Sequence, residues 1–168
     1  MSTKSNIYCL DANVLIQAWQ KYYSPKFCPE YWNILNDLRK QNRIFLPEAV
    51  KEEITRTEDE LSIWLKKSSI PIQKIDEEII KNWQKIIEVN PLHKLLVDNV
   101  KGRSLADPWV ISHAMKMNAT VVTKENKETA YNSKRIKIPN VCENIGLRWI
   151  NDFEFIEEVN IKFSCHLS

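Results

Sequence analysis

Short apolar runs alternate along the chain with longer segments in which apolar residues recur every three or four positions. The runs are rich in β-branched and aromatic residues, which is typical of strands buried in a parallel sheet. One of the five runs, 70–75, contains Pro71, which has no backbone N–H to donate to a neighbouring strand. This favours an edge strand or an extended connection there. The other four runs predict buried strands at 7–10, 44–46, 119–123 and 147–150.

The segments with helical spacing lie between these runs. Ser24-Pro25 interrupts the first of them, and Asp76 and Asn151 are residue types that cap helix N-termini. The alternation predicts an α/β protein with three layers, in which helices cover both faces of a central, mainly parallel sheet. A helical segment is expected between residues 74 and 101. The expected helices cover 14–23, 30–41, 48–67, 76–89, 91–100, 104–117, 139–144 and a terminal segment after Asn151.

The length and composition fit one globular domain of 168 residues. We expect a single domain over 1–168, with an ordered core at 6–158 and a frayed tail at 159–168. The two glycines, Gly102 and Gly146, are too few for a glycine-rich phosphate-binding loop. A net charge of +2 neither requires nor excludes binding to nucleic acid.

The N-terminal residues lack the apolar core of a signal peptide, and no apolar run reaches the length of a membrane span. The sequence therefore predicts a cytoplasmic protein without membrane contact. The four cysteines show neither Cys-x-x-Cys pairs nor zinc-ligand spacing, so we expect free thiols. His93, His113 and His166 have no partner pattern and are expected at the surface or in the core.

Four carboxylates follow strands or lie near the starts of helices. Asp11 and Glu125 come after the first and third buried runs, and Asp107 opens a helix. Glu53 lies at the edge of the core-facing side of its helix, whereas Glu52 points into solvent. Ligands bind at the carboxyl ends of parallel strands. The four acids could converge there, and one or two divalent cations would relieve their mutual repulsion.

Each acid also has a purely structural explanation. Asp11 or Asn13 could cap the helix that follows the first strand. Asp107 could be the partner of Ser104 in a capping box, and Glu53 and Glu125 could be solvated helix and loop residues. The six tryptophans are expected mainly as core or interface anchors, and any that is exposed could instead stack on a nucleobase.

The ordered set of these motifs resembles the PIN-domain family of metal-dependent nucleases. The similar pieces begin at Asp11-Ala12-Asn13, Leu46-Pro47-Glu48, Leu105-Ala106-Asp107 and Val121-Val122-Thr123. The closing segment from Lys137 to Gly146 further resembles an uncharacterised bacterial and archaeal PIN-like group related to the toxin ribonucleases of toxin–antitoxin pairs. The resemblance implies a PIN-like version of the three-layer fold.

The resemblance also implies roles for individual residues. Asp11, Glu53 and Asp107 are the implied metal-binding and catalytic acids, with Mg²⁺ or Mn²⁺ as the cofactor. Glu125, the fourth implied catalytic acid, occupies a position where the family often has Asp, and its longer side chain could act through water. Asn13 corresponds to a small polar residue that orders the site.

The expected function is a metal-dependent endoribonuclease that hydrolyses RNA phosphodiester bonds, as the toxin component of a toxin–antitoxin pair. The alternative is a catalytically inactive PIN-like domain that binds RNA or protein. The expected partners are RNA and an antitoxin docked on the helices of 30–67, and a homodimer stays an open alternative. The expected substrate-binding residues, most of them basic, are Asn13, Arg103, Thr123, Lys124, Lys127, Lys134 and Arg135.

Overall fold

The computed structural model describes residues 5–97, 102 and 104–168, and its centre is a five-stranded sheet. All neighbouring strands are parallel, in the order β3-β2-β1-β4-β5. Their bounds are β1 Tyr8–Leu10, β2 Ile44–Pro47, β3 Ile72–Gln73, β4 Thr120–Val122 and β5 Trp149–Ile150. The predicted parallel sheet is confirmed, and the run with Pro71 supplies an edge strand.

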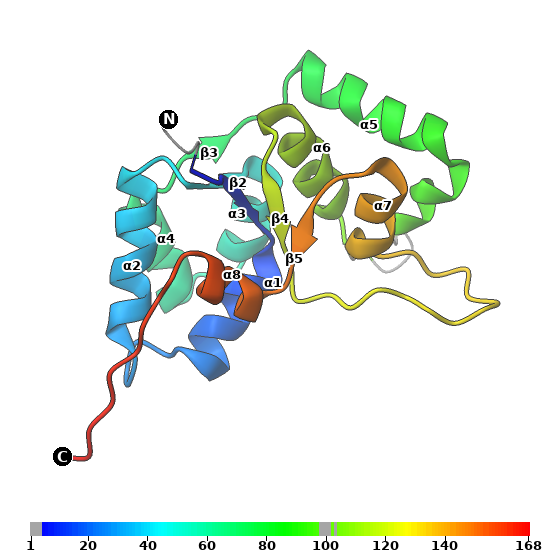
Figure 1. Ribbon diagram of the computed structural model, residues 1–168. Coiled ribbons are helices and arrows are strands. Elements are labelled where there is room, and N and C mark those ends of the chain that lie inside the picture. Colours follow the sequence, from blue (N-terminus) through cyan, green and yellow to red (C-terminus); the bar gives the residue numbers. More distant parts are fainter. Residues whose placement is uncertain (1–4, 98–101, 103) are drawn as a thin grey trace.

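The alternation of side chains along β1 shows that helices cover both faces of the sheet. Tyr8 packs its ring edge-on against Phe155 of α8 (Asp152–Glu158), with the ring centroids 5.0 Å apart. The next residue, Cys9, points the other way and donates a hydrogen bond from Sγ to the Val110 carbonyl of α6 (Asp107–Met117). Since successive side chains point to opposite faces, α8 and α6 lie in different layers, as Figure 1 also shows.

The helix predicted over 48–67 is two helices. α3 spans Glu48–Thr55 and α4 spans Glu60–Ser68, and Asp59 caps α4 by accepting a hydrogen bond from the Ser62 amide. In one continuous helix over 48–67, Thr57 would share the core-facing side with Val50 and Ile54, but Thr57 is exposed. The prediction was wrong there because a side-chain cap at Asp59 restarts the helical phase.

The predicted helical segment after residue 74 is confirmed as far as the structure describes it. α5 spans Glu77–Val89 with Asp76 as its cap, and the 3₁₀ helix η2 spans Pro91–Leu96. The end of the helix expected over 91–100 lies outside the described residues. α5 packs mainly on α6 and lies at the outer edge of the molecule (Figure 1).

The remaining elements agree with the expected order. The first helical segment is α1 (Ala12–Gln17), which continues as a short π-helix, η1 (Ala18–Tyr22). α2 spans Pro29–Lys40, and α7 spans Ile138–Ile145 and ends at Gly146, whose φ of 70° is the left-handed C-cap conformation. The cysteines are free thiols, and the described residues contain no helix long and apolar enough to cross a bilayer.

The segment after α8 contains no further helix or strand among its residues 159–168. It is nevertheless packed at its beginning, because Ile161 is buried and the ring of Phe163 stacks on that of Tyr23 at 5.3 Å. This contact ties the C-terminal segment to the N-terminal helices.

Candidate functional site

The parallel pairing of β1 with β4 brings Asp11 beside Thr123 at the carboxyl edge of the sheet. Leu10 and Val122 are register partners, so the residues that follow them are neighbours. The Thr123 hydroxyl donates to Asp11 Oδ2 at 2.8 Å, and the Ala12 amide donates to Oδ1 at 2.7 Å. Asp11 therefore caps α1 and is also held rigidly at the strand end, with only 4% of its surface exposed.

Two further hydrogen bonds fix the loop that follows β4. Asn13 accepts from the Lys124 amide at 3.0 Å, which ties the loop to the start of α1. Glu125 donates its amide to the Thr123 hydroxyl at 3.1 Å, and its Oε2 accepts from the Ile138 amide at 2.9 Å. One carboxylate oxygen of Glu125 is thus used at the N-terminus of α7, where a negative charge is favoured by the helix dipole.

Asp107 is the first residue of α6 and is almost fully buried, with 6% exposure. The residue in the N-cap position is Ala106, and it makes no side-chain cap hydrogen bond. The capping box that the sequence suggested between Ser104 and Asp107 is therefore wrong: Ser104 lies two residues before the cap, with a left-handed φ of 57°. A side-chain hydrogen bond from Ser104 to Asp107 still lowers the pKa of that carboxyl group, but it does not cap the helix.

The two buried acids, Asp11 and Asp107, are influenced by the charges of the other predicted acids. Burial raises the pKa of Asp11 to about 7, and the negative charges of Glu125 and Glu53 add to the rise. Burial raises the pKa of Asp107 to about 9, and Asp11, Glu125 and Glu53 again contribute in the same direction. The residue Glu53 is exposed as a whole, but partial burial of its carboxyl group raises its pKa. The positive charge of Arg56 acts in the opposite direction. The fold has thus brought the four predicted acids into one electrostatic neighbourhood.

The donor chemistry of this neighbourhood fits a hard divalent cation. Among residues 5–97, 102 and 104–168, no three His, Cys, Asp or Glu side chains form a ready-made metal-binding group. Mg²⁺ does not require one, because it is commonly held by one or two carboxylates, with water and substrate phosphates filling the other positions. Asp11 and Asp107 are the best placed pair, since Asp11 is the charge that most strongly raises the pKa of Asp107.

A cavity of about 260 Å³ opens beside Glu53 and is lined by Arg56, Gly102, Ser104 and Leu105. Arg56 brings a positive charge to this cavity, and sequence reasoning missed it. The signal that could have found it is its spacing from Glu53, because residues three positions apart in a helix share a face.

The structure does not bring all the predicted basic residues to this site. Lys124 extends from the loop after β4 to Asp152 at the start of α8, with Nζ 2.7 Å from Oδ2. Both side chains are nearly buried, and Nζ also lies 4.3 Å from the ring centroid of Tyr22. Lys124 is therefore engaged in a structural ion pair, and only its backbone amide reaches Asn13.

The other predicted basic residues lie away from the acids or outside the described part of the chain. Lys127 pairs with Glu143 of α7 at the surface. Lys127, Lys134 and Arg135 line a hollow of about 500 Å³ together with Leu92 and Leu95 of η2. Arg103 lies outside the described residues.

Comparison with known proteins gives the chain a family and a fold. The family model DUF4411, described as a domain of unknown function, matches residues 8–163. No curated protein matches the sequence closely enough to count as a relative. Among solved structures, a chain in the crystal structure of VapBC2 from Rickettsia felis bound to a DNA fragment from their promoter is similar in fold. It is 23% identical, with a TM-score of 0.53, and the match covers 86% of this chain and 98% of that chain. The three-layer architecture is thus PIN-like, and the chain belongs to the DUF4411 family, a PIN-like family.

Proposed function

We propose that this protein is a metal-dependent endonuclease that hydrolyses phosphodiester bonds in RNA, as the toxin of a toxin–antitoxin pair. The observation that carries the proposal is the gathering of Asp11, Glu53, Asp107 and Glu125 at the carboxyl edge of a PIN-like sheet. The negative charges of Glu53 and Glu125 help raise the pKa of the buried Asp11 and Asp107, and carboxyl groups perturbed in this way are typical of functional sites.

Asp11, Asp107 and Glu53 are the residues that would hold Mg²⁺ or Mn²⁺. A divalent ion supplies positive charge for a phosphodiester and makes a water molecule more acidic. Thr123 and the Ala12 amide fix the orientation of Asp11, each through one carboxylate oxygen. Glu125 is anchored by the Ile138 amide, so its role would be to act through water rather than to bind the ion directly.

Positive charge for the substrate backbone would come from two places. Arg56 lies in the cavity beside Glu53, where it could contact a phosphate next to the scissile one. Lys127, Lys134 and Arg135 would attract the strand from farther away, in a manner that salt weakens. Lys124 is not assigned to the substrate because its ammonium group pairs with Asp152.

The proposed partner is a small antitoxin. The similar solved chain comes from a complex, VapBC2, that is bound to a DNA fragment from their promoter, which supports a partner protein for this fold. The helices α2, α3 and α4, within residues 30–67, are the proposed docking region. The proposal of RNA as substrate rests on the resemblance of the sequence motifs to toxin ribonucleases.

A cleavage assay with short single-stranded RNA and DNA tests the proposed function. RNA should be cut in the presence of Mn²⁺ or Mg²⁺ and left intact with a chelator. Asp11→Asn should reduce the rate at least about a hundredfold, in line with the contributions of positioned catalytic groups. The fold should survive, because Asn caps a helix as well as Asp does.

A matched pair on α3 provides the control. Glu53→Gln should lose activity, whereas Glu52→Gln changes an exposed neighbour on the same helix and should cut at the wild-type rate. Cleavage by Asp11→Asn at the wild-type rate would show that the site is misassigned. RNA binding without cleavage under every metal condition would favour the inactive RNA-binding module.

A further inference from the structure

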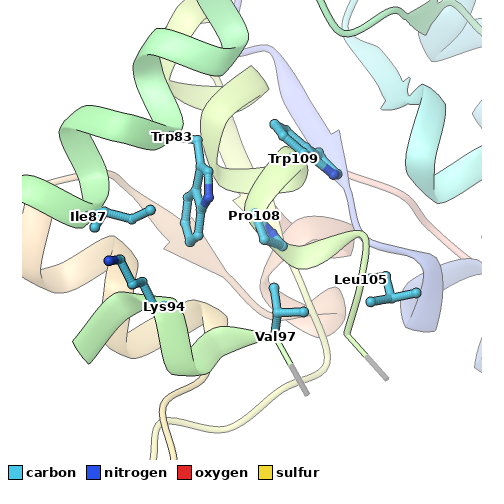
Figure 2. Close-up of a pocket in the computed structure, with 7 residues that line it drawn as sticks. All are labelled: Trp83, Ile87, Lys94, Val97, Leu105, Pro108 and Trp109. Atoms are coloured by element: carbon cyan, nitrogen blue, oxygen red, sulfur yellow. The ribbon is translucent and has the colours of Figure 1, made fainter. Parts of the chain in front are cut away.

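A third hollow, of about 550 Å³, lies between α5 and the segment that leads into α6. Two tryptophans form its walls, and Figure 2 shows them on different helices: Trp83 extends from α5, and Trp109 lies in the first turn of α6. We call it the aromatic hollow; Ile87, Lys94, Leu105 and Pro108 also line it.

The aromatic hollow exists because α5 buries only part of its apolar face. Ile79 and Ile86 are fully buried, whereas Trp83 and Ile87 are half-buried and Ile80 is 44% exposed. Exposure of large aromatic side chains forfeits hydrophobic free energy. Trp83 packs in part against the hydrophobic core, whereas Trp109 is not part of that packing among the described residues. The parts of both indoles that line the concave site are available to a ligand.

The aromatic hollow adjoins the cavity beside Glu53, with one lining residue in common. Leu105 lines both the aromatic hollow and the cavity that contains Glu53 and Arg56. Pro108, which lines the hollow and is drawn between the two tryptophans in Figure 2, directly follows Asp107. A strand whose phosphate lies at the carboxylates would thus have a neighbouring nucleotide at the aromatic hollow.

The chemistry of the lining suits a nucleobase. Indole faces stack on any base, because every base has a π-face, and the exposed Lys94 places a positive charge at the rim for the backbone. The volume lies within the usual range of small-ligand sites. Bases inside a duplex are already stacked and paired, so only an unpaired base can enter.

Resting on the proposed function, we infer that the aromatic hollow binds an unpaired nucleobase of the RNA strand that is cut, close to the scissile phosphate. The substrate is then single-stranded, or looped, at the cleavage site. Trp83 is a substrate-binding residue rather than a catalytic one, because it lies on α5 away from the carboxylates.

A binding experiment tests the inference without requiring cleavage. Asp11→Asn protein is titrated with a short RNA in which 2-aminopurine replaces one base at each position in turn. Stacking should quench the fluorescence at one position, and adding Trp83→Leu should abolish this quenching. The affinity should fall about tenfold to a hundredfold, as expected for the loss of one stacked base. Trp64→Leu is the matched control, because Trp64 packs on Trp19 and Trp32 outside the aromatic hollow.

A cleavage experiment with wild-type protein completes the test. A series of RNAs is prepared, each with a single abasic site at a different position. At one position near the cleaved bond, the abasic site should raise KM about as much as Trp83→Leu does. The two changes together should cost little more than either alone, because they remove the same contact. Wild-type thermal stability of Trp83→Leu establishes that the loss is local.

The outcomes separate this inference from the proposed function. Cleavage that is insensitive to Trp83→Leu and to every abasic position overturns the inference and leaves the nuclease intact. Position-specific quenching that depends on Trp83, without any cleavage, overturns the nuclease and supports the base-binding hollow. Absence of RNA binding overturns both, and binding of an apolar peptide that competes at Trp83 would assign the hollow to a protein partner instead.

Discussion

Asp11 shows that a structural and a functional role can share one carboxylate. Its Oδ1 caps α1 and its Oδ2 accepts from Thr123, so the sequence alternatives of cap and ligand do not exclude each other. An ionised carboxylate has about four lone-pair sites, and two hydrogen bonds leave capacity for a cation. The same hydrogen bonds limit the rotation of the side chain, which keeps it aimed at the site.

His113 gives a pH dependence that belongs to a single residue. The side chain is 1% exposed, its Nε2 has no hydrogen-bond partner among the described residues, and burial lowers its pKa to about 4. The folded protein therefore binds the proton less tightly than the unfolded chain, whose histidine titrates near 6.5. Stability from this residue is fully present above that pH and is lost as the pH falls towards 4.

We predict that the free energy of unfolding falls by about 2 kcal/mol when the pH is lowered from 8 to 5, because His113 takes up a proton more readily in the unfolded chain. Urea unfolding of wild type and His113→Leu at several pH values measures it, because the difference between the two curves isolates this histidine from the titrating carboxylates. His166→Gln, at an exposed position, is the control and should follow the wild-type curve. Parallel curves for wild type and His113→Leu would contradict the prediction.

At the scale of elements, the loop after β4 connects three parts of the fold. Its residues reach α1 through Asn13, α7 through the bond between Glu125 and Ile138, and α8 through Lys124. Asp152 is the first residue of α8, so the buried ion pair with Lys124 fixes this helix to the carboxyl edge of the sheet. The position of Glu125 depends on this loop staying in place.

Lys124→Met should destabilise the protein by about 3 kcal/mol, because it leaves Asp152 buried without its partner. Adding Asp152→Asn should recover part of the loss. Lys127→Met, which breaks a more exposed pair with Glu143, should cost less than about 1 kcal/mol. Chemical unfolding measures all three, and KM for RNA should stay unchanged in folded Lys124→Met. A large rise in KM without loss of stability would restore Lys124 as a substrate contact.

At the scale of the whole molecule, the parallel sheet decides where charge collects. Asp11 and Glu125 follow strands, Asp107 begins a helix at the same edge, and Glu53 lies on α3, while the net charge of the chain is only +2. The local concentration of negative charge is therefore a property of the fold and not of the composition. Relief of this repulsion should stabilise the folded state as a whole.

Divalent ions should accordingly raise the melting temperature. At an Mn²⁺ concentration one hundred times its dissociation constant, linkage predicts an increase of about 5 to 10 °C for a domain of this size. Asp11→Asn should show a much smaller increase, and Glu52→Gln should respond like wild type. Differential scanning fluorimetry with and without chelator measures the shift. Equal responses of wild type and Asp11→Asn would place the ion elsewhere.

Much of the architecture could be read from the pattern of apolar positions. Five strands, their parallel arrangement and most helices followed from local periodicity and from caps such as Asp76, because these signals act over a few residues. The helix over 48–67 failed at Asp59, where a single side-chain hydrogen bond outweighed a continuous apolar pattern. Residue type alone could not show whether the cap at Asp59 or the apolar pattern would determine where the helix ends.

The sequence by itself determined the α/β fold and proposed the four acids as candidate site residues, because the ends of strands and the faces of helices are local features. Only the tertiary structure decided that Lys124 turns to Asp152, that Ser104 does not cap Asp107, and that Arg56 faces the cavity of Glu53. It also decided that Trp83 and Trp109, which are 26 positions apart, line one hollow. Such pairings depend on how helices pack across the sheet, which is a long-range property that no short sequence pattern encodes.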